Sequence, residues 1–443
     1  MKTRFTSICS RATMTLLVML LTTVSSWAQT SGNCGTSGHE SDVTWSYNST
    51  NNTLTISGDG AMMYYGLTSD YLHSTAPWNH LDGELEHVVV NNGVTSVGSY
   101  AFAMCSKLVS ASLPTSVFQI DQAAFYTTDL IRIDIPSTTE VTLGENAFSY
   151  CHDNLVIAVP ANLLKTYQTA TNWSTYAAKL VGVLSETTGF GTTFATGNYE
   201  YTRTFKCGVA STVCLPFSVT ASEAESIGNF YTFNGVNKNA NPWEVIMQET
   251  SPSNLVEGAL SANTPYLFKP YIFEGKTQGD DVEFTFSGTV STAGDAGYSG
   301  WIESGTSNEW AFHGVYYNYV WSSDPDNIYG FAAQSYDGGS YNVSPGDFVK
   351  AGAGASIAPF RAFLQCNTVT NAPRRGAAEN LPSRMTVRLV NADGETTSLT
   401  PNSPGLSQGE GSEYWYDLSG RKVDKQPTQK GVYINNGKKV VIK

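Results

Sequence analysis

The chain has 443 residues, a formal net charge of -13 and only 14% charged residues. A chain this acidic repels nucleic acid, and no basic patch with interleaved aromatic residues offsets the charge, so we set nucleic-acid binding aside. Its 40 Gly, 24 Tyr and 20 Phe are typical of a protein rich in β-strands and turns.

Residues 1–28 have the three parts of a secretory signal peptide. A basic leader precedes an apolar run from Met14 to Leu21, and Ser26-Trp27-Ala28 forms a small-x-small cleavage site. Cleavage removes three basic residues and no acidic one, which changes the net charge from -13 to -16. No later run approaches the roughly 18 apolar residues of a transmembrane helix. We therefore expect an exported protein without a transmembrane segment, at the cell surface or outside the cell.

Residues 29–85 are expected to form an N-terminal β cap. The runs Val43 to Tyr47 and Thr53 to Ile56 flank a turn-forming stretch at 48–52, which predicts a hairpin. This hairpin would cover the open end of the repeats that follow.

Within residues 86–182, which are expected to end in a capping helix, the stretch from 86 to 160 repeats itself every 23 residues. Ala-Phe pairs begin at 101, 124 and 147, and the apolar column Val97, Ile120 and Leu143 keeps the same step. Each unit also carries a short alternating run that ends in proline. A period in the low twenties with one strand per unit predicts a leucine-rich-repeat solenoid, in which successive coils share one core.

The solenoid strands predict one buried and one outward face. Ile131, Ile133 and Ile135 should point inward, because they alternate with Arg132 and Asp134. Solenoids usually bind partners on such an outward strand face, although an ordinary solvated sheet is the alternative. In the aligned strands, two outward rows form the candidate protein-binding face: His87, Ser110, Arg132 and Val156 in one, Val89, Ser112 and Asp134 in the next.

After Pro160 the sequence predicts one helix, from Ala161 to Ala178, which would cap the second end of the solenoid. From 188 to 368, seven or more short strands separated by turns predict a β-sandwich-like domain. The fold class is therefore mostly β.

Aromatic residues crowd the second domain. Trp301, Trp310 and Trp321 are a candidate platform for sugars, since a ring face can meet an apolar C–H face. Burial in the core is the competing interpretation. Asp324 and Asp326 could supply calcium ligands, but turn chemistry explains them equally well, and we predict no metal.

Six cysteines follow the leader, and the solenoid argues against one pairing. Cys105 and Cys151 lie two coils apart, roughly 10 Å at about 4.8 Å per strand, whereas a disulfide needs Cα atoms within about 7 Å. Cys207 and Cys214 could face each other across a hairpin, with or without a bridge.

Residues 369–383 are expected to be a linker, and 384–443 a small β domain. Asp393-Gly394 and Asn436-Gly437 each predict a hairpin. Residues 412–443 carry seven Lys or Arg against three acids. The run from Tyr416 to Val423 and the following Lys430-Gly431-Val432-Tyr433-Ile434 resemble the C-terminal sorting domain of type nine secretion, which implies an address for export.

The residues before and within the repeats resemble the BspA-type leucine-rich-repeat surface proteins over about 34–182. The resemblance implies an exported bacterial binding scaffold, some of whose relatives bind host matrix proteins. The motifs that carry it include Cys34-Gly35, Thr44-Trp45, the run Leu54 to Gly58, Ala76-Pro77-Trp78, and Gly93 to Gly98 followed by Ala101-Phe102.

Catalytic chemistry is not indicated. The six histidines form no His-Glu-x-x-His motif, and the sequence contains no Cys-x-x-Cys motif. Cys151 and His152 are neighbours in the sequence, whereas the nucleophile and base of a catalytic pair usually come from distant segments. We predict a non-enzymatic, adhesin-like monomer without cofactors, which binds a host or bacterial surface protein. The alternatives are a polysaccharide-binding protein with its site in the second domain, and a passive envelope component.

Overall fold

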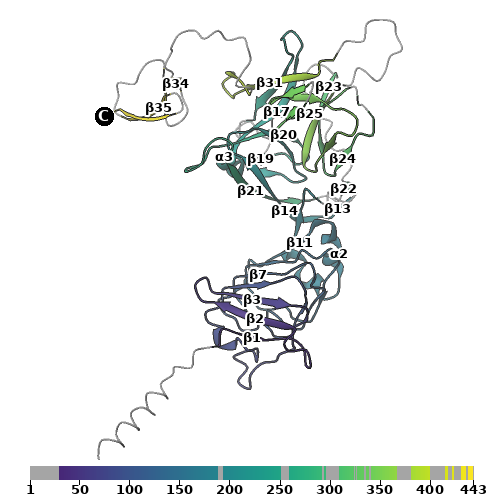
Figure 1. Ribbon diagram of the computed structural model, residues 1–443, viewed down its shortest axis with the longest axis vertical. Helices are drawn as coiled ribbons and strands as arrows, with labels where there is room; N and C mark the ends of the chain where they lie inside the picture. The colour runs from purple at the N-terminus through teal and green to yellow at the C-terminus, as the bar shows by residue number, and fades with distance from the viewer. Residues whose placement is uncertain are drawn as a thin grey trace, which may run out of the picture.

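The computed structural model describes residues 29–187, 193–250, 259–291, 294–295, 309–323, 325, 327–333, 336–338, 341–366, 381–399, 415–417, 422–423, 431–435 and 438–442. These residues form mainly β-strands, as predicted. In Figure 1 the solenoid and the second region follow each other along the long axis of the molecule, and strands β14 and β21 lie where they meet. The proposed signal peptide lies outside the described residues. Among those residues, no helix has the length and apolar character needed to cross a membrane.

One ten-stranded sheet runs the length of the solenoid and continues beyond it. Its second and third strands, β2 and β3, are the predicted hairpin, and pairing from β3 to β14 is parallel, as stacked coils require. β14 then pairs antiparallel with β21 over ten residues. In order, the strands are β1 (Ser31–Asn33), β2 (Val43–Asn48), β3 (Thr53–Gly58), β5 (His87–Val90), β7 (Ser110–Ser112), β9 (Arg132–Asp134), β11 (Val156–Pro160), β12 (Leu180–Leu184), β14 (Gly197–Lys206) and β21 (Asp281–Val290).

A second, narrower parallel sheet closes the other side of the coils. Its strands contain the predicted apolar column, and Val97, Ile120 and Leu143 are all buried. The sequence indicated the column but not that it forms strands. They are β4 (Gly60–Ala61), β6 (Val94–Val97), β8 (Gln119–Ile120) and β10 (Thr142–Leu143).

The Phe side chains of the Ala-Phe pairs build a continuous aromatic stack through the core. The ring centroids of Phe102 and Phe125 lie 5.3 Å apart and those of Phe125 and Phe148 lie 5.6 Å apart. Trp78 extends the stack at one end and Trp173 at the other. Alternate amides of this segment donate to carbonyls of the next coil, as Phe125 N does to Ala147 O at 2.9 Å. Neighbouring coils are thus joined by hydrogen bonds behind the strands as well as along them.

One predicted core residue is exposed. Ile133 and Ile135 are buried as expected, but Ile131 is 41% exposed. The strand β9 begins only at Arg132, so Ile131 precedes it, in the turn where its amide donates to Val109 O. The alternation of side chains therefore does not extend to this position.

The single helix predicted for 161–178 is wrong, because the segment is broken into three pieces: η2 (Ala161–Leu163), α2 (Leu164–Thr169) and η3 (Trp173–Lys179). Asn172 adopts a left-handed conformation, with φ of 64°, and directs Trp173 into the core.

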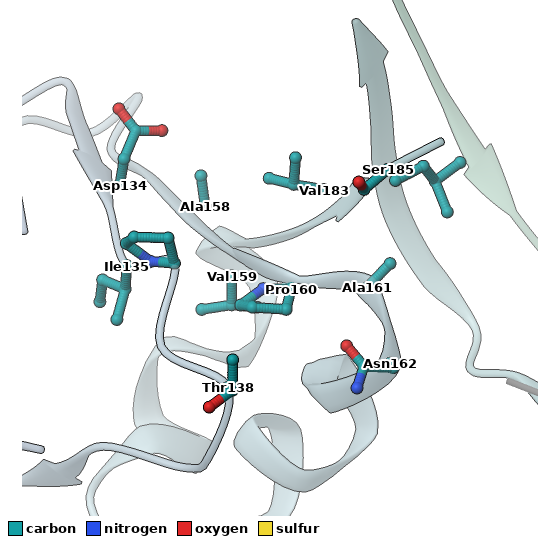
Figure 2. Close-up of a pocket in the computed structure, with 12 residues that line it drawn as sticks. Asp134, Ile135, Thr138, Ala158, Val159, Pro160, Ala161, Asn162, Val183 and Ser185 are labelled. Atoms are coloured by element: carbon teal, nitrogen blue, oxygen red, sulfur yellow. The ribbon is translucent and has the colours of Figure 1, made fainter. Parts of the chain in front are cut away.

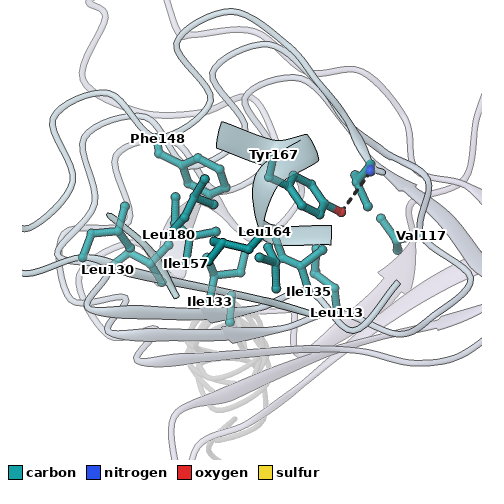
Figure 3. Packing of buried hydrophobic residues seen from close by; sticks show 14 of the residues in the cluster. Leu113, Val117, Leu130, Ile133, Ile135, Phe148, Ile157, Leu164, Tyr167 and Leu180 are labelled. Atoms are coloured by element: carbon teal, nitrogen blue, oxygen red, sulfur yellow. Dashed lines mark hydrogen bonds between the residues drawn. The ribbon is translucent and has the colours of Figure 1, made fainter. Parts of the chain in front are cut away.

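Because of this break, side chains of the segment can bond to backbone N–H and C=O groups of the last coil. These groups would otherwise lack partners, because no further coil follows on that side. Trp173 Nε1 donates to Val141 O at 2.6 Å, and Asn172 Nδ2 donates to Leu143 O at 2.7 Å. The Tyr167 hydroxyl accepts from Val141 N at 3.0 Å, inside the cluster of Leu and Ile side chains in Figure 3. The predicted capping role is confirmed by these contacts.

The second region is built on another large sheet, whose ends come together around one apolar core. Its strands pack face to face as in a sandwich, yet they are joined in one curled sheet: Cys214 N donates to Phe360 O, and Ala362 N to the Thr212 hydroxyl, both at 3.1 Å. The order is β15 (Ser211–Cys214), β20 (Pro265–Pro270), β17 (Gly228–Asn237), β18 (Glu244–Glu249), β31 (Arg384–Val390), β28 (Phe348–Lys350), β25 (Ile328–Phe331), β30 (Arg361–Cys366) and β23 (Trp310–Val315).

The hairpin that we assigned to the C-terminal domain belongs to this second sheet. β31 pairs with β32 (Thr396–Ser398) as predicted, but it also lies parallel to β18 and antiparallel to β28. The second predicted hairpin is confirmed in a separate small sheet, made of β33 (Trp415–Asp417), β34 (Lys422–Val423), β35 (Gly431–Asn435) and β36 (Lys438–Ile442).

Short elements complete the second region. The helix α3 (Ala221–Ile227) is capped by the Thr220 hydroxyl, which accepts from Glu223 N. Small pairs are formed by β16 (Val219–Thr220) with β19 (Ala259–Leu260), β24 (Tyr319–Val320) with β29 (Ser356–Ile357), β26 (Tyr336–Gly338) with β27 (Tyr341–Val343), and β13 (Thr193–Phe194) with β22 (Gly294–Asp295). In the solenoid, η1 (Asn79–Leu81) precedes β5.

The solenoid and the second region share a core and a partly buried ion cluster. Apolar side chains from both belong to one continuous cluster, from Cys34 to Phe360. Arg203 on β14 is almost fully buried and donates to Thr212 O at 2.8 Å, while Glu186 lies 2.7 Å from Arg361 and 3.5 Å from Arg203. The six cysteines in the described part of the chain are all free, including Cys207 and Cys214.

Candidate binding face and terminal pocket

The structure places the two predicted rows in register on the outward face of the solenoid sheet. The residues in both are half-buried or exposed, whereas Val88, Ala111 and Ile133 between them are buried. Cross-strand partners in the first row are His87 with Ser110, Ser110 with Arg132, and Arg132 with Val156, and in the second Val89 with Ser112 and Ser112 with Asp134.

Arg132, the one arginine of these rows, is engaged by two carboxylates. It donates to Asp134 at 2.9 Å and makes two bonds, at 3.0 and 2.5 Å, to Glu200. The hydrogen bonds that Glu200 accepts from the guanidinium, followed by those that Asp134 accepts, raise the pKa of the arginine above its usual range. Glu200 lies on β14, beyond the expected end of the repeats, so the sequence gave no reason to pair it with Arg132. The pair is a fixed feature of the face, and Arg132 is not an isolated cation.

A pocket of about 350 Å³ opens where the second row ends. It is formed by the ends of β9, β11 and β12 and the start of η2. In Figure 2, Asp134, Ala158 and Val183 project to the same side of the three strands. Most of its wall is apolar, and Asp134, Thr138, Asn162 and Ser185 supply polar atoms. The remaining lining residues are Ile135, Pro136, Ala158, Val159, Pro160, Ala161, Val183 and Leu184.

Two prolines lie at the strand ends that form the pocket. Pro136 follows β9 and Pro160 ends β11, and a proline has no amide hydrogen to donate to a neighbouring strand. The proline at the end of each repeat was visible in the sequence and could have indicated an edge. Of the predicted face residues, only Asp134 lines the pocket.

The predicted sugar platform is not formed as proposed. Trp310 is only 3% exposed and packs in the core against Tyr329, with ring centroids 5.7 Å apart, so it offers no face to a ligand. Trp321 is half-buried and meets the rings of Tyr319 and Phe363 edge-on. Trp301 and the proposed calcium ligands Asp324 and Asp326 lie outside the described residues.

The described residues offer no evident catalytic or metal site. They contain no group of three or more His, Cys, Asp or Glu side chains placed to hold a metal ion. Burial raises the pKa of the Cys151 thiol, which favours the unreactive protonated form over the nucleophilic thiolate. His73 pairs with Asp82 at the surface, and this pairing, with its hydrogen bond, raises the histidine pKa.

Comparison with known proteins identifies the repeats. Residues 80–177 match a family model described as "BspA type Leucine rich repeat region (6 copies)", which covers under a quarter of the chain. The solenoid is a leucine-rich repeat region. This match agrees with the period of 23 residues and with the parallel sheet.

A crystal structure of a leucine-rich repeat protein from Eubacterium ventriosum is 21% identical to part of this chain. The alignment covers 30% of this chain and 45% of that one, with a TM-score of 0.21, and a likeness at this level carries no argument about the fold. No curated protein matches the chain significantly.

Proposed function

We propose that this protein is a non-enzymatic, exported bacterial surface protein whose leucine-rich repeat face binds another protein. The observation that carries the proposal is the apolar pocket at the end of the outward strand face. The second predicted row ends at this pocket with Asp134, and the pocket offers a place where a partner side chain can be buried. An interface needs such a buried centre, because a few anchored residues supply most of its binding energy.

The charge around the pocket favours a partner that presents an apolar side chain next to a basic one. Asp134 lies at the edge of the pocket, and Glu200 binds the same arginine, Arg132, that Asp134 binds. The mature chain carries a net charge of -16, counted as -13 less three leader cations. Complementary charge speeds association and selects among partners. Matrix or surface proteins with exposed basic segments fit this description.

Export is proposed from the two ends of the chain. Residues 1–28 would direct secretion, and the C-terminal strands from β33 to β36 would be the sorting address of type nine secretion. The basic composition of 412–443 sets this end apart from the acidic remainder. Deletion of residues 412–443 should leave the protein inside the outer membrane if the proposal holds.

Replacing Val183 with arginine is expected to weaken binding to a protein partner by at least about tenfold, which is about 1.4 kcal/mol. Val183 is half-buried and projects from β12 beside the pocket, so the long charged side chain would fill it and repel a basic partner. The measurement is surface plasmon resonance with residues 29–443 over immobilised matrix and bacterial surface proteins.

Thr285→Arg is the matched control, because it adds the same charge at an exposed position of β21. It should keep the affinity of the unmodified chain. Equal affinity of both variants would refute the pocket as the anchor, and absence of saturable binding to any protein would favour the passive envelope component.

A further inference from the structure

A second pocket of the solenoid lies at the opposite ends of two strands that form the terminal pocket. It has a volume of about 440 Å³ and is lined by the segment that leads into β11 and by the end of η3, which leads into β12. The terminal pocket is at the other ends of these strands. Because β11 has five residues, roughly 16 Å of strand separates the two pockets. We refer to the second one as the tyrosine pocket, after Tyr150 in its lining.

Tyr150 gives the tyrosine pocket an accessible aromatic ring. Its side chain is 75% exposed, although its ring meets that of Tyr126 edge-on, with centroids 5.3 Å apart. The neighbouring ring supports Tyr150 from one side and leaves most of its surface open to solvent. An aromatic ring held in this way can receive the apolar face of a ligand.

The fold of the coil does not account for an aromatic residue at this position. Thr127 and Met104 occupy the same place one and two coils earlier, and all three residues have a positive φ: 67° for Met104, 56° for Thr127 and 59° for Tyr150. The coil therefore imposes a left-handed conformation that glycine or asparagine adopts more readily than tyrosine. Neither burial nor backbone geometry explains why the last coil carries a tyrosine here.

Two polar side chains of the tyrosine pocket keep donors for a ligand. Asn154 N donates to Nδ1 of His152 at 3.0 Å, so the neutral imidazole carries its proton on Nε2 and can donate it. Asn146 accepts from the Ser149 hydroxyl through Oδ1 at 3.2 Å, which leaves its amide NH₂ group as a donor. A ligand in this pocket can therefore form hydrogen bonds beside the aromatic ring.

The charges in the tyrosine pocket are balanced. Its lining contains one carboxylate, Asp153, and one ammonium group, that of Lys179, which donates to the carbonyl oxygen of Asp153. With His152 neutral, the lining carries no net charge and does not select a charged ligand. Its polar groups also disfavour a purely apolar anchor, which would bury them without hydrogen bonds.

From this combination we propose that the tyrosine pocket binds a neutral sugar unit of a polysaccharide. An apolar C–H face of the sugar ring would lie against Tyr150, and its hydroxyls would bond to His152, Asn146 and Asp153. Hydroxyls both donate and accept, which suits two donors beside a carboxylate acceptor. This site is independent of the proposed protein-binding face, and it lies in the solenoid, whereas the predicted platform was in the second domain.

The test is isothermal titration of residues 29–443 with the neutral polysaccharides dextran, laminarin, galactan and mannan, and with polygalacturonate as the acidic comparison. The proposal expects saturable binding to at least one neutral polysaccharide. Added salt should leave the affinity unchanged, because the pocket has no net charge to be screened.

Tyr150→Ala removes the ring and should weaken this binding by at least about tenfold, whereas Tyr150→Phe keeps the ring and should retain most of the affinity. His152→Ala removes one hydrogen-bond donor and should weaken binding by about three- to tenfold. Tyr71→Ala is the matched control, because Tyr71 is 71% exposed, also has a positive φ, of 62°, and does not line the pocket. It should bind as the unmodified chain does.

Several results would overturn the proposal. They are absence of binding to all four neutral polysaccharides, binding that Tyr150→Ala leaves unchanged, and equal loss in Tyr71→Ala, which would indicate only a general effect of exposed rings. Binding to polygalacturonate alone, weakened by salt, would show attraction to charge. Near-ultraviolet circular dichroism of each variant separates loss of the site from loss of the fold. Because Val183→Arg should not affect this binding, failure here and failure of the protein-binding proposal are distinguishable.

Discussion

Replacing Phe125 with alanine is expected to lower the free energy of unfolding by about 3–5 kcal/mol. Phe125 is fully buried in the middle of the aromatic stack, with the rings of Phe102 and Phe148 at 5.3 and 5.6 Å. Removal of the ring would leave a cavity that cannot collapse, because backbone hydrogen bonds to the coils on both sides fix the spacing between coils. Urea unfolding followed by circular dichroism measures the loss.

Phe118→Ala is the matched control within the same coil. Its ring is 55% exposed, so its removal should change the free energy of unfolding by no more than about 0.5 kcal/mol. Similar losses for the two variants would contradict the stack as the main source of solenoid stability.

Acid is expected to destabilise the second region through His313. This side chain is 1% exposed, and burial lowers its pKa to about 4. Between pH 6.5 and 4, the unfolded chain binds a proton that the folded chain excludes. The stabilisation is therefore complete above about pH 6.5 and is lost as the pH falls, by about 2–3 kcal/mol at pH 4.5.

The measurement is urea unfolding at pH 7.5 and 4.5 for the unmodified chain, His313→Gln and His39→Gln. Other groups titrate in this range, so the useful quantity is the difference between variant and unmodified chain at each pH. His313→Gln should reduce the acid-induced loss, whereas His39→Gln, at an exposed position, should not. An unchanged loss in His313→Gln would refute the assignment to this histidine.

The solenoid could be predicted because its order repeats along the sequence. The step from Phe102 to Phe125 to Phe148 fixes both the period and the alignment of neighbouring strands, so the outward rows follow directly. The end of the repeats could not be predicted in the same way. β12 and β14 extend the sheet without the Ala-Phe pair, and the break at Asn172 depends on carbonyl and amide groups that only the last coil leaves unpaired.

The second region could be predicted only in part. Its strands alternate and its turns are marked by glycine and asparagine, but pairing between β18 and β31 joins segments about 140 residues apart. No local pattern specifies such a pairing. The placement of Trp310 in the core shows the same limit, because all six residues of β23 are buried and no local pattern said that both faces of this strand are covered.

The candidate sites differ in how much of each could be predicted from the sequence. The rows from His87 to Val156 could be predicted from the strand register alone. To predict the terminal pocket, one would have to know that Pro136, Pro160 and Val183 come together from three separate coils. Sites assembled across strands became visible only with the fold.

Hydrogen exchange of the mature chain, with and without a matrix or surface protein that binds it saturably, tests the central claim most directly. The account predicts slower amide exchange on binding at 134–138, 158–162 and 183–185, which surround the terminal pocket. Protection confined to 349–363, in the second region, or unchanged exchange throughout the solenoid would contradict a protein-binding face on the leucine-rich repeats.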